Sequence, residues 1–184
     1  MNKFISKFTK VILCAGMAAS ISACSSSNTS DAPNNTETLS IDENLKTSFK
    51  DDTIKTPECT MKIKEAKVVP PITPSFMDVN ELVVIFTLTN TGKEELKSPR
   101  LQWRWSVDMY QEYEDSFQEL DEGLYMMYLD ENKIYRDNQQ AIVKPGGSID
   151  LMFTYEIDDM SKPIKMSVHD SSYNEVGEKI YNLQ

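Results

Sequence analysis

The stretch "ELVVIFTLTN" at residues 81–90 decides the fold, because it is rich in the β-branched and aromatic residues that favour strands. It breaks at "NTGKEE" (90–95), where an Asn and a Gly followed by charges are typical of a hairpin turn. Downstream, "IDLMFTYEI" (149–157) carries a hydrophobic side chain at every second position and follows the turn "VKPGGS" (143–148). Such a period of two predicts a strand with one buried face.

Other segments repeat this pattern. "LQWRWSVDMY" (101–110) alternates without a break and predicts a strand whose buried face carries both tryptophans, Trp103 and Trp105. The runs 59–69, 164–168 and 178–184 predict three more strands. Residues 111–140 are longer than a hairpin loop, and we expect a strand pair or a short helix among them. Together these segments predict an all-β fold, an antiparallel β-sandwich over residues 58–184.

The N-terminus has the features of an export signal. Residues 1–10 contain three lysines and no acid, and residues 11–21 are almost wholly apolar or small. This apolar run is too short for the roughly 20 residues of a spanning helix. Ile21-Ser22-Ala23-Cys24 resembles the lipobox of bacterial lipoproteins. The resemblance implies a signal peptide over 1–23, cleavage after Ala23 and a diacylglyceryl group on Cys24, because two acyl chains hold a protein stably on a bilayer.

The residues after the lipobox differ sharply in composition. "SSSNTSDAPNNTETLS" (25–40) consists almost entirely of small polar residues, with few apolar ones as far as residue 57. Such a segment cannot bury enough surface to offset its ordering entropy. Residues 24–57 are therefore expected to form a lipidated, flexible tether, with residues 45–54 left open as a short helix or an extra strand. The protein should sit on the extracytoplasmic face of a bacterial cell membrane.

The charge of the chain limits its partners. The formal net charge is −10, and removal of residues 1–23, with three lysines and no acid, makes it −13. Phosphates would repel such a domain, so nucleic acid is not an expected partner. A solvated acidic surface, a bound cation and a basic partner all fit this charge.

Few residues can support catalysis. Once Cys14 leaves with the signal and Cys24 is lipidated, Cys59 is the one thiol left, and its place at the start of a strand favours a buried residue. His169 is the only histidine, and consecutive strand residues such as His169 and Asp170 point to opposite faces. The sequence lacks the H-E-x-x-H, C-x-x-C, P-loop and dinucleotide motifs. No catalytic residue, metal ligand or cofactor is therefore assigned.

The segment 108–122 differs most from the rest of the chain. It holds seven acids and neither Lys nor Arg. Calcium takes six to eight oxygen ligands, but the order of acids here is not that of an EF-hand. Aromatic residues crowd the same region, and if exposed they offer a recognition surface. The candidate ligand-binding residues are Tyr110, Tyr113, Asp115, Phe117 and Tyr125.

Several quoted stretches together resemble a known family. "VVIFTLTNTGKEEL", "YQEYEDSFQEL", "IVKPGGSIDLMFTYEI" and "KPIKMSV" are similar to the immunoglobulin-like domain of exported lipoproteins in domain-of-unknown-function family 5067. The resemblance covers residues 59–183, with anchors at Asn90, Gly92, Gln111, Pro145 and Gly146. It implies an immunoglobulin-like sandwich and an exported location, and it brings no activity, substrate or catalytic residue.

Two hypotheses about function follow. The first is a non-enzymatic binding or adhesion module, anchored to the membrane through Cys24, that binds an envelope protein or wall glycan through residues 111–140. The second is a cell-envelope hydrolase or calcium-dependent enzyme that uses the acidic loop 108–122. The second hypothesis predicts clustered carboxylates in a pocket.

Overall fold

The computed structural model describes residues 46–72 and 79–183. The chain divides into two units, Met1–Leu39 and Ser40–Gln184. The first unit, which includes the predicted signal peptide and Cys24, lies outside the described residues, as does the start of the predicted tether. No helix among the described residues is long and apolar enough to cross a membrane.

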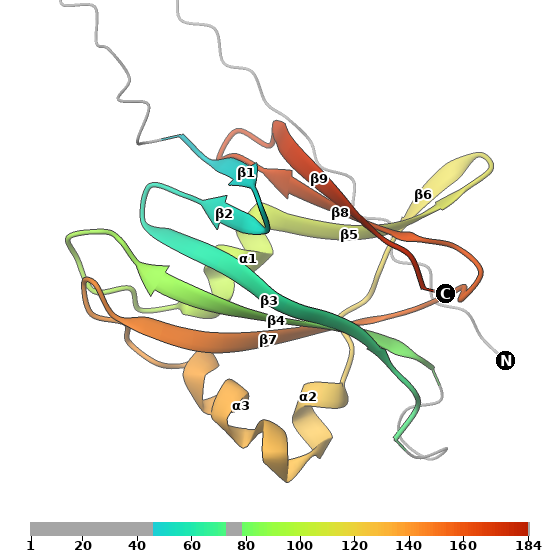
Figure 1. The fold of residues 1–184 in the computed structure, drawn as a ribbon, viewed down its shortest axis with the longest axis horizontal. Helices are drawn as coiled ribbons and strands as arrows, with labels where there is room; N and C mark the ends of the chain where they lie inside the picture. Colours follow the sequence, from blue (N-terminus) through green and yellow to red (C-terminus); the bar gives the residue numbers. More distant parts are fainter. Residues whose placement is uncertain (1–45, 73–78, 184) are drawn as a thin grey trace, which may run out of the picture. The chain divides into compact units, whose positions relative to one another are not determined.

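The described part of the second unit contains two antiparallel sheets that pack face to face (Figure 1). The first sheet has the order β1-β2-β3-β4-β7. Its strands are β1 (Ser48–Lys50), β2 (Thr53–Lys55), β3 (Cys59–Val69), β4 (Glu81–Asn90) and β7 (Ser148–Glu156). The second sheet has the order β6-β5-β8-β9. Its strands are β5 (Val107–Tyr113), β6 (Ser116–Glu119), β8 (Ile164–His169) and β9 (Glu175–Tyr181). The predicted all-β sandwich is confirmed.

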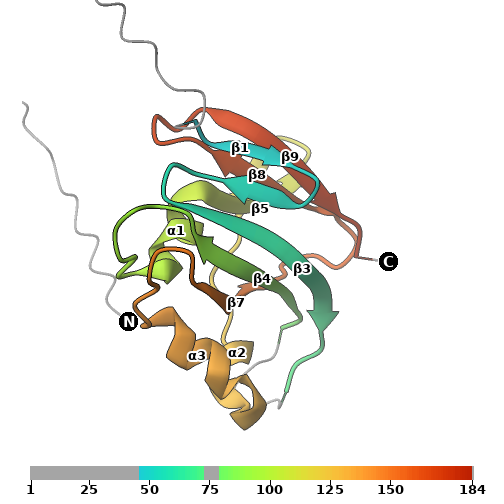
Figure 2. The same ribbon diagram turned by 60° about the vertical axis from the view of Figure 1, so that its left-hand side comes forward.

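Strand β4 is buried on both faces, which explains its nearly continuous apolar sequence. Leu82, Val84 and Phe86 point into the main core between the sheets. Val83 and Ile85 point to the opposite face, where a second apolar cluster forms under two helices. These helices are α2 (Tyr125–Tyr128) and α3 (Lys133–Gln139), which cover the outer face of the first sheet (Figure 2). A strand covered on both faces has apolar residues in succession rather than in alternation.

The predicted strand over 101–110 is wrong in its first half. Helix α1 (Pro99–Ser106) occupies this position, and β5 begins only at Val107. The buried residues of α1 are Pro99, Gln102, Trp103 and Ser106, which have the i, i+3, i+4, i+7 spacing of a helix face. Trp103 is fully buried, but Trp105, predicted to lie on the same face, is 63% exposed. Ser98-Pro99 was the local signal for a helix, because proline is favoured in the first turn.

The boundary of the folded domain also differs from the prediction. Strands β1 and β2 lie within residues 24–57, which were expected to form the tether. The strand alternative for residues 45–54 is therefore confirmed. Ile54 is fully buried in the main core, and Phe49 packs against it. Folded structure thus begins by Ser48, ten residues before the expected boundary at residue 58.

Residues 111–140 contain both a strand pair and short helices, which are the two alternatives expected for them. They include the end of β5, all of β6, α2, the short 3-10 helix η2 (Asp130–Asn132) and α3. The buried carboxylate of Glu81 fixes the start of α2, because it accepts hydrogen bonds from the backbone N–H groups of Leu124 at 2.9 Å and Tyr125 at 3.0 Å. A Cβ on Gly123 would lie 2.1 Å from Oε2 of Glu81. Only glycine fits there without displacing this carboxylate.

Two of the family anchors hold connections between strands. Nδ2 of buried Asn90 donates to the backbone oxygens of Glu94 and Val143, both at 2.8 Å, and so joins the turn after β4 to the turn before β7. Gln111 is fully buried in β5. Its amide oxygen accepts from the N–H groups of Asp158 and Asp159, and its Nε2 donates to the backbone oxygen of Asp159 at 2.7 Å. The amide of Asn90 thus links two turns to each other, and the amide of Gln111 links β5 to the connection between β7 and β8.

Candidate functional site

The candidate site lies where the chain crosses from one sheet to the other. After β6, Leu120 still pairs with β5 through its N–H and the oxygen of Met109 at 2.9 Å. The chain then reaches β7, where the N–H of Gly123 donates to the oxygen of Thr154 at 2.7 Å. The N–H of Glu156 donates in turn to the oxygen of Asp121 at 2.9 Å. Segment 120–123 therefore closes one side of the sandwich and leaves a cavity beside it.

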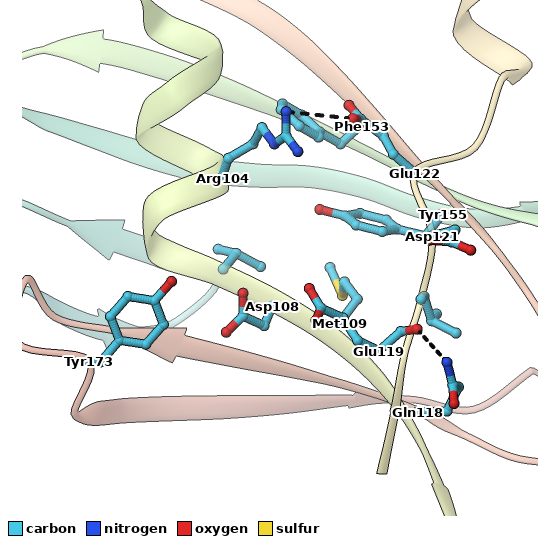
Figure 3. Close-up of a pocket in the computed structure, with 12 residues that line it drawn as sticks. Arg104, Asp108, Met109, Gln118, Glu119, Asp121, Glu122, Phe153, Tyr155 and Tyr173 are labelled. Carbon is cyan, nitrogen blue, oxygen red and sulfur yellow. Dashed lines mark hydrogen bonds and ion pairs between the residues drawn. The ribbon is translucent and has the colours of Figure 1, made fainter. Parts of the chain in front are cut away.

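We call this hollow the corner cavity; it has a volume of about 500 Å³. Figure 3 shows its lining, which comes from α1, β5, β6, β7, the crossing segment and the loop between β8 and β9. Its residues are Arg104, Val107, Asp108, Met109, Gln118, Glu119, Leu120, Asp121, Glu122, Phe153, Tyr155 and Tyr173. Elements distant in sequence thus form one site of the size usual for small ligands.

The cavity carries a surplus of negative charge. Only Glu122 among its four acids is paired with an arginine: Nη2 of Arg100 donates to both carboxylate oxygens, at 2.6 and 2.7 Å. Arg104 lies 4.0 Å from the same carboxylate. Both nearby cations are therefore drawn to one acid, and Asp108, Glu119 and Asp121 have no lysine or arginine ion-pair partner among the described residues.

The floor of the cavity is aromatic and rigid. The phenol oxygen of Tyr155 accepts a hydrogen bond from Nε1 of Trp103 at 2.6 Å. The Trp103 ring stacks on Phe86, with 4.3 Å between ring centroids, and on Phe153, with 5.9 Å. Burial raises the pKa of Tyr155, so its hydroxyl stays neutral. The floor therefore presents a fixed, uncharged hydroxyl and aromatic surface beneath the carboxylates.

Asp108 joins the cavity to the outer face of the second sheet. Its Oδ2 accepts a hydrogen bond from the Tyr110 hydroxyl at 3.1 Å and lies 3.2 Å from Nε2 of His169. Burial, and then the charge of Asp108, raise the pKa of Tyr110 to about 12. The partner of His169 is thus Asp108 on the neighbouring strand rather than the adjacent Asp170. Both ring nitrogens of His169 are buried, so a substrate in the cavity cannot reach them.

The five residues predicted from sequence do not form one site. Tyr110 and Phe117 share a hollow of about 370 Å³ on the outer face of the second sheet, with Lys165, Ser167, His169 and Glu175. Tyr113 lies under the ammonium of Lys162, which is 4.5 Å from the ring centroid. Asp115 is exposed in the turn between β5 and β6, and Tyr125 packs into the second apolar cluster beyond the first sheet.

The acidic segment 108–122 is divided in a similar way. Asp108, Glu119, Asp121 and Glu122 line the corner cavity, whereas Glu112, Glu114 and Asp115 are exposed on the hairpin of β5 and β6. Among the residues that the structure describes, no three His, Cys, Asp or Glu side chains are placed to hold a metal ion. Cys59 is fully buried, as expected from its position in a strand, and burial raises the pKa of its thiol.

Sequence reasoning missed the cavity residues that come from outside 108–122. Tyr155 follows the period of two in residues 149–157, which predicts a side chain facing the core but not one that borders a cavity. A strand over 101–110 would carry Arg104 on the face opposite the tryptophans, whereas Arg104 projects from α1 towards Glu122 (Figure 3). Tyr173 lies in a loop that carries no motif. The packing of α1, β7 and the loop between β8 and β9 around segment 120–123 brings these residues together.

Comparison with solved structures supports the fold. One similar structure is a candidate lipoprotein from Staphylococcus aureus, with a TM-score of 0.65 and 20% identity, covering 74% of this chain and 92% of that chain. Another is a protein from Enterococcus faecalis, with a TM-score of 0.58 and 15% identity, covering 75% of this chain and 94% of that one. A search of curated proteins gave no match. At these identities the likeness shows a shared fold.

A family model gives the stronger assignment. The model described as "Domain of unknown function (DUF5067)" matches residues 23–170. The match includes Asn90 and Gln111, whose buried amides hold the connections between strands. It extends over well more than half of the chain, so the protein belongs to the DUF5067 family.

Proposed function

We infer that the protein is a lipid-anchored binding module on the extracytoplasmic face of a bacterial membrane. The anchor is proposed from the charged start, the short apolar run and the sequence Ile21-Ser22-Ala23-Cys24. The description of the similar Staphylococcus aureus protein as a candidate lipoprotein supports this location. Lipidation of Cys24 would tether the sandwich to the membrane through the segment before β1.

The corner cavity is the observation that supports binding. Three of its carboxylates lack an arginine or lysine partner among the described residues, and its floor consists of fixed aromatic rings. Carboxylates attract positive charge, and aromatic faces attract cations through their quadrupole. The ligand that this lining favours is a positively charged organic group, such as the lysine or arginine side chain of an envelope protein. The acidic balance of the whole chain steers the same class of partner towards the domain.

Binding fits the site better than catalysis. A general base must come within hydrogen-bond reach of the proton that it removes. The His169 nitrogens and the Cys59 thiol are buried, so neither group is available at the cavity surface. Tyr110 and Tyr155, with raised pKa values, remain protonated near neutral pH. The carboxylates that line the cavity match the cluster that the hydrolase hypothesis predicts, but the described residues place no accessible histidine or thiol beside them. This lack of a second catalytic group favours a non-enzymatic role for the domain.

The binding of pentalysine tests this proposal. Titration calorimetry at low salt would compare the full protein, in detergent micelles, with the double variant Glu119→Gln/Asp121→Asn. We expect the double variant to bind about tenfold more weakly, because two cavity carboxylates have been removed. The peptide should also bind the wild type less tightly as salt increases.

The matched control is Glu94→Gln/Glu95→Gln, which changes the net charge equally at two exposed acids outside the cavity lining. It should bind pentalysine as the wild type does, within a factor of about two at low salt. Equal losses in both double variants would show that net charge alone attracts the peptide. That result would contradict a binding site in the corner cavity.

A further inference from the structure

The edges of the two sheets differ in how they are covered. The edge of β7 pairs with segment 121–123 through the backbone hydrogen bonds of Gly123 and Glu156. The edge strands β1 and β9 contact each other, with Phe49 against Gly177. An ion pair of 2.5 Å between Asp52 and Lys179 reinforces this contact. Strand β6 is the one edge for which the described residues provide no cover, and its hairpin projects from the second sheet (Figure 1).

The backbone of β6 directs pairing groups outwards along this edge, and of these the oxygen of Glu119 accepts one long bond of 3.3 Å from the side-chain amide of Gln118. The bond from the Leu120 N–H to the Met109 oxygen sets the phase of the antiparallel ladder, in which Glu119 lies opposite Tyr110. Hydrogen-bonded and non-hydrogen-bonded pairs alternate along such a ladder. Gln118 therefore directs its backbone groups to β5, while Phe117 and Glu119 direct theirs outwards. All four residues of β6 are exposed, and Phe117 is 60% exposed.

The chemistry around β6 indicates what can pair with it. Edge strands are commonly protected from pairing by lysine, proline or a bulge, and β6 has neither lysine nor proline. Its own hairpin is acidic, with Glu112, Glu114 and Asp115 and no basic residue between 108 and 122. The nearby Lys165, which lines the hollow beside Phe117, is already paired with Glu175 and Glu178. A second copy of this chain would bring like charges together. A basic peptide would instead gain both backbone pairing and charge complementarity.

We propose that β6 accepts an extended, basic segment of a partner protein as an additional strand of the second sheet. The proposal rests on the proposed binding function and names its partner class. Backbone groups of Phe117 and Glu119 form the new hydrogen bonds, and the Phe117 ring packs against an apolar side chain of the segment. Gln118 and Glu119 belong to both β6 and the corner cavity lining. A basic side chain of the added strand can therefore enter the cavity.

Residue-resolved amide hydrogen exchange tests this arrangement. The full protein in detergent micelles would be mixed with an octapeptide of alternating lysine and valine. We expect exchange at the amides of Phe117 and Glu119 to slow by about tenfold or more when they gain a partner. The Gln118 amide, already paired with β5, should change much less.

Phe117→Pro is the decisive variant. It removes an N–H that points away from β5, so the hairpin keeps its own bonds, and proline is tolerated at such edge positions. We expect octapeptide affinity to fall by about tenfold relative to Phe117→Ala, which lacks the same ring but keeps the N–H. An octapeptide of alternating glutamate and valine should not bind.

The outcomes separate the two proposals. One outcome is that the octapeptide slows hydrogen exchange at the cavity amides of Asp121 and Glu122 while the amides of Phe117 and Glu119 exchange as before. In that case strand addition is wrong and cavity binding stands. If the octapeptide binds Phe117→Pro as tightly as Phe117→Ala, strand addition is likewise overturned. If neither the cavity nor the β6 amides respond to the octapeptide, both proposals fail.

Discussion

Trp103→Ala is expected to lower the free energy of unfolding of the domain by about 3–5 kcal/mol. Trp103 is fully buried, stacks on Phe86 at 4.3 Å and donates a hydrogen bond to the hydroxyl of Tyr155. The substitution leaves a cavity between the sheets and removes the partner that holds Tyr155 at the floor of the corner cavity. Urea denaturation monitored by circular dichroism would measure the loss.

Trp105→Ala is the matched control for this prediction. Trp105 lies two residues further along α1 and is 63% exposed. Its removal should change stability by no more than about 0.5 kcal/mol, as for most surface substitutions. A strand over 101–106 would bury both rings on one face. Similar losses for the two variants would therefore contradict the helix.

Gln111→Ala is expected to destabilise the domain by about 3 kcal/mol. The Gln111 amide makes hydrogen bonds to the backbone of Asp158, Asp159 and Lys162, at distances from 2.7 to 3.1 Å. Alanine would leave these backbone groups without their side-chain partner at the connection between β7 and β8. Urea denaturation would report the loss, and amide exchange at residues 158–162 should become faster.

Gln118→Ala provides the comparison, because Gln118 lies directly opposite Gln111 in the β5–β6 ladder. Gln118 is exposed, and its amide nitrogen makes one long bond of 3.3 Å to the backbone oxygen of Glu119. Its loss should alter stability by about 0.5 kcal/mol or less. If Gln111→Ala were as mild as Gln118→Ala, the buried amide would not be what fixes the connection.

The sequence predicts most strands because their side chains alternate against one core. Predictions for β3 and β4 match the observed bounds, and those for β7, β8 and β9 agree within a few residues. The error at 101–106 arose because Trp103 is buried whether the segment is a strand or a helix. Gln102 and Trp105 distinguish the two, and here the glutamine is buried and the tryptophan exposed. For this segment, the alternation of apolar and polar residues indicated the wrong structure, whereas Pro99 correctly indicated the start of a helix.

The candidate site was less predictable than the fold for a physical reason. The acids of 108–122 and their neighbouring tyrosines are recognisable as an unusual stretch, and four of those acids do line the corner cavity. Their convergence with Tyr155 and Arg104 depends on segment 120–123 pairing with β7, which is a tertiary contact. Strands β1 and β2 were predictable only as one of two alternatives, a short helix or an extra strand, because Phe49 and Ile54 are too few to make a pattern. Residues such as these acquire their roles only when the sheets pack.

Intact mass and detergent partitioning of protein expressed in a bacterial host would show whether Cys24 carries the lipid anchor. The wild type would be compared with Cys24→Ser. We expect a wild-type chain that begins at residue 24, carries the mass of a diacylglyceryl group and partitions into detergent. The variant should lack the lipid and remain in the aqueous phase. If both chains are unlipidated and aqueous, the lipoprotein assignment is contradicted.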